Sequence, residues 1–475
     1  MARRRYGPAV ELARRWLPPL LALLAVVTGG VLLARVDDGI VTDHVVVDGV
    51  PLDVMRPASA ARAPGVVVAH GYAGSARLMA QFGDTLVARG YTVVLPDLDG
   101  HGASTRKPVD LQHDLDVAVA HLRRLPTVDP ARIALVGHSM GAGAVTRYAA
   151  THPDITATVA ISLPGADDVT PNRPAHLLLL VGQLEFASFH ETATAVGGAE
   201  EVPGVEHISI LYASRTHRLT ADWIDDAFAR TPVDTTLPSP VRRLVPAGIL
   251  LLGLLLGFVP LVRLTVGAGG RPAPPSAQLV RVVVVTAGAA ALAVVVVPFL
   301  PTTRWELGGY TAGFTAVAGV AILAYLRAFS SPLGGPRPLL AALLLIPYAA
   351  AAIAVPLHLG FTHAVPVGPR WWLLLAVWAG LAVLAYAAGR LAGGTFRGDL
   401  IVSAIVVVAL TAAAVVGLAS GFLLLVVPLL AVLMLIQAAL AVVLRAANAP
   451  PWLTALTGAI LVAWPIATTL PIVSP

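Results

Sequence analysis

The chain has 475 residues, a formal net charge of +5 and no cysteine, which excludes disulfides, thiolate metal sites and a cysteine nucleophile. Its composition is 57% hydrophobic and only 12% charged. Soluble domains contain roughly a quarter charged residues, so much of this chain is expected to face lipid. The arginines stand singly at the ends of apolar runs, which argues against a nucleic-acid partner.

The acidic residues divide the chain into two parts. Nearly all of them lie between Asp37 and Asp234, and beyond Pro240 only Glu306 and Asp399 remain. This distribution predicts a water-facing domain followed by a lipid-facing one.

The first apolar stretch follows a basic segment and runs from Leu17 to Ala34. It is long enough to span a bilayer, and no small-x-small cleavage site precedes Arg35, so a retained anchor is favoured over a signal peptide. We expect residues 1–35 to be a cytoplasmic basic N-terminus, which includes Arg3, Arg4 and Arg5, and a first transmembrane helix.

A Pro-rich linker is expected at residues 231–243, and a transmembrane domain of about eight helices at 244–475. Residues Gly417, Ser420 and Gly421 favour a hairpin that divides the long apolar run from Leu400 to Leu444. The predicted spans are 244–262, 280–300, 308–327, 338–357, 371–389, 400–420, 422–444 and 452–472.

The arginines also predict an orientation, because positive charge favours cytoplasmic loops. With the N-terminus inside, the outer loops between the later spans hold only Arg304 and Arg370, while the pair Arg242-Arg243 does not fit the pattern. This arrangement places the water-facing domain and the C-terminus outside the cytoplasm, in a protein of the cell membrane. The cytoplasmic ends would then collect Arg263, Arg271, Arg281, Arg327, Arg337, Arg390, Arg397 and Arg445.

Residues 36–230 alternate strand-like and helix-like patterns, which indicates an α/β fold with helices on both faces of a mostly parallel sheet. A hairpin is predicted first, with its turn at Asp48-Gly49. Continuous apolar runs then predict buried strands at 65–69, 91–95, 132–136, 156–161 and 176–181. Helices are expected at 75–89, 108–125, 139–152 and 214–230.

Polar and glycine-rich segments follow these strands, at the sheet edge where parallel α/β folds place their working residues. They are HGYAGS at 70–75, PDLDGHGAS at 96–104, GHSMG at 137–141 and VGQLE at 181–185. His207 comes later, ahead of the last predicted helix. The order serine, acid, histidine along the chain is that of a nucleophile-elbow hydrolase.

With these motifs, residues of about 40–230 resemble the α/β-hydrolase superfamily, and most closely its dienelactone-hydrolase-like and monoacylglycerol-lipase-like serine hydrolases. The resemblance implies Ser139 as nucleophile, His207 as general base and then acid, and Glu185 as the residue that orients the imidazole. It further implies backbone N–H groups of Tyr72 and Met140 as the oxyanion hole. Gly137 and Gly141 would permit the sharp turn of the elbow.

Alternatives stay open at two positions. Asp167 or Asp168 could replace Glu185 as the acid. His217 could replace His207, although a solvated histidine inside a helix is its plainer interpretation.

The remaining polar residues are interpreted structurally. His70 and His101 are expected to brace the site through hydrogen bonds to backbone, and His138 to pack beside the nucleophile. Asp97 and Asp99 are expected to fix a loop. Gln437 would make a hydrogen bond between helices, and His358 with His363 would lie in an unremarkable outer loop.

No His, Asp and Glu cluster has metal-ligand spacing, so no cofactor and no metal are expected. Residues 162–175 are also too few for the helical cap that many relatives insert, which predicts an open pocket roofed by membrane or neighbouring loops.

The sequence therefore predicts a membrane-anchored, extracytoplasmic serine hydrolase that cleaves an ester or related acyl bond of a lipid or envelope component through an acyl-enzyme. An acyltransferase with the same triad, and a non-catalytic binding head on a transport or scaffold protein, are the alternatives. The sequence does not address the oligomeric state.

Overall fold

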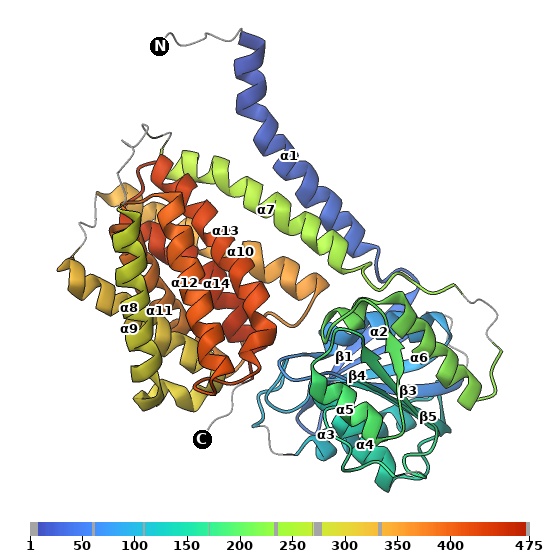
Figure 1. The fold of residues 1–475 in the computed structure, drawn as a ribbon. Coiled ribbons are helices and arrows are strands. Elements are labelled where there is room, and N and C mark those ends of the chain that lie inside the picture. Colours follow the sequence, from blue (N-terminus) through green and yellow to red (C-terminus); the bar gives the residue numbers. More distant parts are fainter. Residues whose placement is uncertain are drawn as a thin grey trace.

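The computed structural model describes residues 8–58, 62–107, 110–170, 172–231, 236–267, 269, 278–330 and 335–471. An α/β domain lies beside a body of long helices; α1 packs against α7 near the α/β domain, and its other end projects beyond the helical body (Figure 1). The predictions for Arg3, Arg4, Arg5, Arg271, for residues 108–109 at the start of a helix and for 232–235 of the linker lie outside the described residues.

The α/β domain is built on one eight-stranded sheet with the order β1-β2-β4-β3-β5-β6-β7-β8. The first two strands form the predicted hairpin, whose turn residues Asp48 and Gly49 both have positive φ, at 48° and 82°. Two positive φ values in succession match the right-handed twist of the strands. The strands are β1 (Ile40–Val47), β2 (Val50–Pro57), β3 (Ala63–Ala69), β4 (Thr92–Pro96), β5 (Val128–His138), β6 (Ala157–Ile161), β7 (Leu177–Gly182) and β8 (Glu200–Val202).

From β4 and β3 onward the strands are parallel, and helices cover both faces as predicted. Alternate residues of β3 point to opposite sides of the sheet. Val66 and Val68 pack in the cluster that includes α2 (Ala80–Ala88) and α6 (Ser214–Ala227). Val67 and Ala69 pack in the cluster with α3 (Leu111–Arg124) and α4 (Met140–Thr151).

The predicted strands and helices of this domain are present, with three differences. The expected helix at 75–89 begins as a 3₁₀ turn, η1 (Ala76–Met79), before α2. The short strand β8 and the helix α5 (Ala187–Ala195) had no prediction. None of the residues of α5 is buried, so its sequence has no need of the apolar stripe that marks a packed helix. Without that stripe the helix could not be predicted.

Nine helices of the described chain are long and apolar enough to cross a membrane. The predicted division of the long apolar run is confirmed, since α12 ends at Val415 and α13 begins at Leu423. The helices are α1 (Pro8–Ala34), α7 (Leu244–Thr265), α8 (Leu279–Val296), α9 (Glu306–Leu326), α10 (Pro336–Gly360), α11 (Arg370–Leu391), α12 (Phe396–Val415), α13 (Leu423–Ala446) and α14 (Pro451–Thr469). The 3₁₀ turns η3 (Val297–Phe299) and η4 (Pro301–Trp305) connect α8 to α9.

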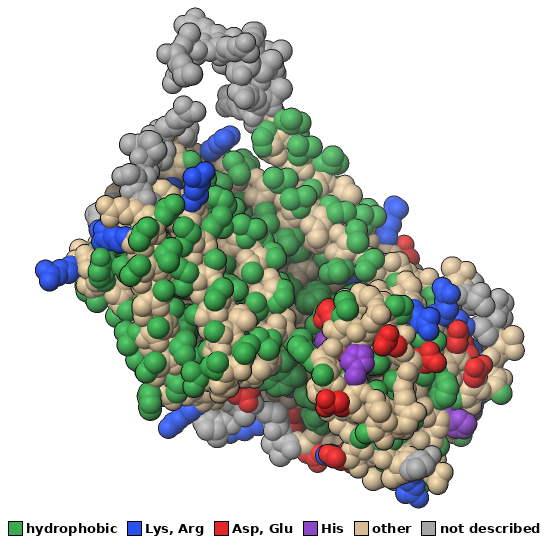
Figure 2. Space-filling model, viewed as in Figure 1, with side chains coloured by type: hydrophobic (Ala, Val, Ile, Leu, Met, Phe, Trp, Pro, Cys, Tyr) green, Lys and Arg blue, Asp and Glu red, His purple; other side chains and the backbone are tan. Residues whose placement is uncertain are grey.

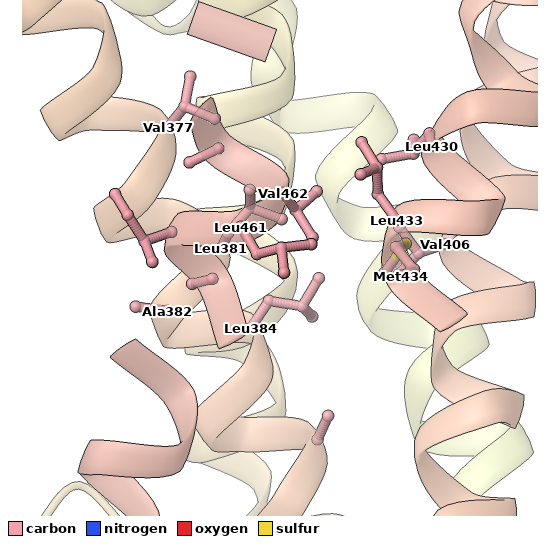
Figure 3. Close-up of a cluster of buried hydrophobic side chains, with 14 of the residues drawn as sticks. Val377, Leu381, Ala382, Leu384, Val406, Leu430, Leu433, Met434, Leu461 and Val462 are labelled. Atoms are coloured by element: carbon pink, nitrogen blue, oxygen red, sulfur yellow. The ribbon is translucent and has the colours of Figure 1, made fainter. Parts of the chain in front are cut away.

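The helical body has a large cluster of buried apolar side chains and an apolar outside. Side chains from α11, α12, α13 and α14 fill its centre, among them Val377, Val406, Leu433 and Leu461 (Figure 3). Figure 2 shows hydrophobic side chains over the visible face of this body, whereas acidic side chains gather on the α/β domain. An apolar exterior of this kind is the surface that lipid covers.

Helices α1 and α7 pack closely because glycines lie at their contact. A Cβ added to Gly29 would come within 2.7 Å of the Leu250 amide nitrogen, and one added to Gly253 within 2.7 Å of the Val26 amide nitrogen. Small residues of this kind allow the backbones of membrane helices to approach.

An ion-pair network joins the start of α7 to the α/β domain. Arg243 donates from Nε and Nη2 to the Asp84 carboxylate at 2.9 and 2.6 Å, and from Nη2 to Asp37 Oδ1 at 2.5 Å. The Asp84 side chain is only 1% exposed, so its charge depends on this partner. The Arg242-Arg243 pair that departs from the predicted orientation pattern thus has a structural role.

Substitution Arg243→Ala is expected to lower the free energy of unfolding of the full chain in detergent by about 3 kcal/mol, because it leaves the Asp84 carboxylate buried without its main partner. Denaturant titration measures this loss. Arg242→Ala is the control, since Arg242 Nε lies 3.6 Å from Asp84 Oδ2 and its side chain is 25% exposed. An equal loss in both variants would contradict the assignment.

Candidate active site

Ser139 occupies a strained turn between β5 and α4. Its φ of 52° and ψ of −117° lie outside the regions that residues with a side chain normally adopt. Such strain costs about 1–3 kcal/mol and persists where the surroundings hold it. Here the Ser139 amide donates to the Ile161 carbonyl of the neighbouring strand at 2.8 Å.

The two flanking glycines have no room for a side chain. A Cβ on Gly137 would lie 2.3 Å from the Gly141 carbonyl oxygen, and one on Gly141 would lie 2.5 Å from the His70 carbonyl oxygen. Larger residues would push α4 away from the sheet, so GxSxG here is a packing requirement of the turn.

Three side chains from separate segments form a continuous hydrogen-bonded chain. Ser139 Oγ lies 3.0 Å from His207 Nε2, and His207 Nδ1 lies 2.9 Å from Glu185 Oε2. Glu185 follows β7, and its own amide donates to the Gly182 carbonyl at 3.1 Å. The side chain of His207 is 5% exposed and that of Glu185 is fully buried. This arrangement can pass a proton from the serine hydroxyl to the imidazole while the carboxylate holds the ring.

Two further residues support this chain and were not singled out from the sequence for such a role. Ser162, directly after β6, donates a short hydrogen bond to Glu185 Oε1. His138 Nε2 donates to the backbone carbonyl of His207 at 2.9 Å, so it fixes the histidine loop as well as packing beside the nucleophile. Ser162 follows its strand at the same sheet edge as Ser139 and Glu185, and this position is the feature of the sequence that could have identified it as a site residue.

The two alternatives left open by the sequence lie elsewhere. Asp168 pairs with Arg147 at 2.9 Å, and Asp167 is exposed. His217 is fully buried, which corrects the interpretation of a solvated helical histidine. Its Nδ1 lies 2.7 Å from Thr85 Oγ1 and its Nε2 lies 2.9 Å from the Leu211 carbonyl, so both ring nitrogens are engaged in the core.

The proposed oxyanion donors stay predictions. In the described part of the chain, no hydrogen bond to another protein group is found for the backbone N–H of Tyr72 or Met140. The side chain of Tyr72 has a partner in the helical body, because its hydroxyl donates to Glu306 Oε2 at 2.5 Å. Burial and this carboxylate raise the pKa of the Tyr72 phenol, which keeps it protonated as the donor.

The loops beside the serine are held by buried polar groups, as expected. His70 Nδ1 donates to the Gly71 carbonyl at 2.8 Å, and its Nε2 accepts from the Leu98 amide at 3.1 Å. Burial lowers the pKa of His70 to about 3, so the neutral ring makes both bonds. Asp97 accepts from the amides of Ala76 and Ala103 at 2.7 and 2.8 Å.

Other polar predictions have mixed outcomes. Asp99 pairs with Arg106 at 2.9 Å within its loop. A hydrogen bond between helices was expected from Gln437. Its side-chain carbonyl oxygen makes none and is buried without a partner among the described residues. The rings of His358 and His363 lie edge-on at 5.2 Å, and in the part of the chain that the structure describes no cluster of three His, Asp or Glu side chains could hold a metal.

The sequence of this domain matches known hydrolases. Residues 61–189 fit the family model described as serine aminopeptidase S33. Over these residues the domain is similar to serine hydrolases of the α/β-hydrolase superfamily. The predicted fold class is therefore confirmed, as the mostly parallel sheet also requires.

Two curated relatives illustrate the likeness. The quorum-quenching protein AidA of Acinetobacter baumannii is 32% identical over 111 residues, which cover 22% of this chain and 36% of the relative. Cutinase 1 of Thermobifida cellulosilytica is 29% identical over 103 residues, which cover 20% of this chain and 38% of the relative. The chain thus spans little more than a third of the length of these relatives.

Solved structures match about two fifths of the chain. A dienelactone hydrolase described as putative from Klebsiella pneumoniae is 17% identical with a TM-score of 0.33, covering 40% of this chain and 99% of its own. An α/β serine hydrolase without lid from Xanthomonas campestris is 17% identical with a TM-score of 0.33, covering 41% and 97%.

Substitution Ser162→Ala is expected to lower kcat about tenfold with little change in KM, because Glu185 Oε1 loses its donor and orients His207 less well. Initial rates with p-nitrophenyl butyrate measure this. Thr194→Ala is the control, since Thr194 lies on exposed α5 and bonds only within that helix. An unchanged kcat would exclude a positioning role for Ser162.

His217 should make the folded chain sensitive to acid. Burial lowers its pKa in the folded state from 6.5 to about 4, so between these values the unfolded chain binds a proton that the folded chain does not. Stability therefore falls as the pH decreases from 6.5 towards 4, by up to about 1.4 kcal/mol per pH unit from this residue.

The variant His217→Gln should show a shallower loss of unfolding free energy between pH 7 and pH 5 than the unchanged chain, by denaturant titration in detergent. The exposed His176 supplies the matched control, His176→Gln. If the unfolding free energy of both variants fell with pH as steeply as that of the unchanged chain, the burial of His217 would not be the source of the acid sensitivity.

Proposed function

We propose that the protein is a membrane-anchored serine hydrolase that cleaves a carboxylic ester outside the cytoplasm. The observation that carries the proposal is the chain of hydrogen bonds from Ser139 through His207 to Glu185 at a strained elbow. A binding head would have no need of the strain or of a buried carboxylate behind a histidine.

The reaction follows from the positions of these groups. Ser139 Oγ attacks the ester carbonyl while His207 Nε2 takes its proton, and Glu185 stabilises the imidazolium. The negative charge on the carbonyl oxygen is held by the amides of Tyr72 and Met140. The C–O bond then breaks, His207 returns the proton to the leaving alcohol, and an acyl-serine remains.

Water completes the cycle. His207 takes a proton from the water that attacks the acyl-serine, the bond to Ser139 Oγ breaks, and the serine regains its proton as the carboxylic acid leaves. All steps use side chains and backbone of this chain, so the proposal needs no cofactor.

An ester substrate is supported by the relatives, two of which are named cutinase or quorum-quenching protein. The location of the protein at a membrane is supported by the nine apolar helices in the described residues. A lipid or other envelope ester is the substrate class that fits both, since a hydrolase fixed beside a bilayer meets such esters without diffusion through water.

The orientation rests on the arginines. Those of the helical body concentrate at the end far from the α/β domain, which is the pattern of cytoplasmic loops. At the near end, Arg242, Arg243 and Arg370 bind the α/β domain, whereas Arg304 is exposed. In this proposal residues 36–230 form the extracytoplasmic hydrolase, residues 231–243 the linker, and 1–35 with 244–475 the membrane part. The far-end arginines of the described chain are Arg263, Arg281, Arg327, Arg337, Arg390, Arg397 and Arg445.

The deciding experiment is labelling of the full chain in membranes by a fluorophosphonate probe, which reacts with an activated serine. Labelling is expected in the unchanged protein and absent in Ser139→Ala, because Ser139 Oγ is the hydroxyl that pairs with His207 Nε2. Ser104→Ala, a substitution of a buried serine in the same domain, is the control and should keep its label. Labelling that survives Ser139→Ala would refute the proposed nucleophile.

A further inference from the structure

A pocket of about 790 Å³ lies where the α/β domain meets the helical body. Its walls come from the loop after β3, from α9 and from the connection between α12 and α13. Tyr72, Glu306, Leu307, Tyr310, Leu418 and Phe422 are among its lining residues. Two parts of the chain that are far apart in sequence therefore share one cavity.

The pocket is adjacent to the nucleophile through Tyr72. The preceding residue, Gly71, lies so near the elbow that a Cβ added to it would come within 3.1 Å of Ser139 Cβ. The Tyr72 ring then packs edge-on against Phe422 with ring centroids 4.7 Å apart. Tyr72 thus directly follows a residue that lies against the serine turn, while its own side chain contacts the helical body.

Glu306, the first residue of α9, binds Tyr72 and has a strained backbone conformation. Its φ of 48° and ψ of −133° are as unusual as those of Ser139, and strain of this kind concentrates at functional sites. The strained turn presents the Glu306 carboxylate to the Tyr72 hydroxyl at 2.5 Å.

One polar group in the wall of the pocket has no partner. Tyr310, one turn further along α9, is 6% exposed, and its hydroxyl makes no hydrogen bond in the described part of the chain. A buried hydroxyl without a partner costs free energy unless a ligand or water satisfies it. Beside it the wall is apolar, formed by Leu307, Leu418 and Phe422. The lining therefore suits a molecule with an apolar chain and an oxygen acceptor.

The pocket also lies at the end of the apolar body that faces the α/β domain. Helices α9 and α13 begin beside it, so it marks the boundary of the apolar body on the side of the α/β domain. Tyrosine is enriched at such boundaries, where acyl chains meet polar headgroups.

We propose that this pocket binds the fatty-acyl chain of a lipid ester while the ester carbonyl lies at Ser139. The inference rests on the proposed ester hydrolysis and adds the substrate class and the part of the chain that selects it. The membrane helices then supply a specificity site of the enzyme as well as its anchor.

The test compares two esters that differ only in chain length, p-nitrophenyl acetate and p-nitrophenyl laurate, on the full chain in detergent. Ala419→Trp places a large ring in the pocket, and the ratio of kcat/KM for laurate to that for acetate is expected to fall about tenfold. Leu418→Asp places a charge in the same wall at a residue that is 51% exposed, and should lower the ratio in the same direction.

The matched control is Val416→Trp. Val416 belongs to the same connection between α12 and α13, is 66% exposed and does not line the pocket, so its substitution should leave the ratio as it is. An unchanged ratio in both pocket variants, with acetate still hydrolysed, would overturn the acyl-chain site alone. Failure of the unchanged chain to hydrolyse either ester would instead overturn the proposed function.

Discussion

The strained turn at Ser139 is the constraint on which the site depends. A residue with φ of 52° directly after a buried strand is held there by its amide bond to Ile161 and by the close approach of α4 to β5. Gly137 and Gly141 make that approach sterically allowed. Every other element of the site is placed relative to this turn, because the neighbouring parallel strands end at the same edge of the sheet.

The surroundings of the Glu185 carboxylate follow from the order of the strands in the sheet. Strand β6 separates β5 from β7, so Ser162 at the end of β6 lies between the nucleophile strand and the strand that carries Glu185. A hydroxyl there can reach the carboxylate, and its bond to Oε1 leaves Oε2 for His207. The buried Glu185 charge is thus stabilised by two donors, which offsets part of the cost of removing a carboxylate from water.

Much of this arrangement could be predicted from the sequence because it depends on local patterns. The apolar runs mark the strands, the Asp48-Gly49 turn marks the hairpin, and the glycines of the elbow flank Ser139. The position of Ser162 after a strand placed it at the right edge of the sheet, but its contact with Glu185 depends on which strands are neighbours, which the sequence does not state. The burial of His217 was also missed, because a histidine whose two nitrogens both find partners in a core looks in sequence like one that faces water.

The contacts between the two parts of the chain were beyond sequence reasoning for the same reason, and they bear on why the chain has so many apolar helices. Arg370, only 2% exposed, donates to the carbonyls of Gly100 and Gly102 at 2.6 Å each, and so holds the loop whose His101 packs against Tyr72. Thr362 contacts Ser75 at 2.8 Å, beside the same site.

These contacts come from the start of α7, the connection from α10 to α11, the start of α9 and the connection from α12 to α13. A single connection would leave the α/β domain free to turn relative to the helical body. Several attachment points from one packed body fix its orientation, and those from α9, from the connection of α10 to α11 and from the connection of α12 to α13 reach the loops after β3 and β4. Several helix ends of one packed body thus present a defined wall to the loops beside Ser139, which an anchor of one or two helices has too few ends to provide.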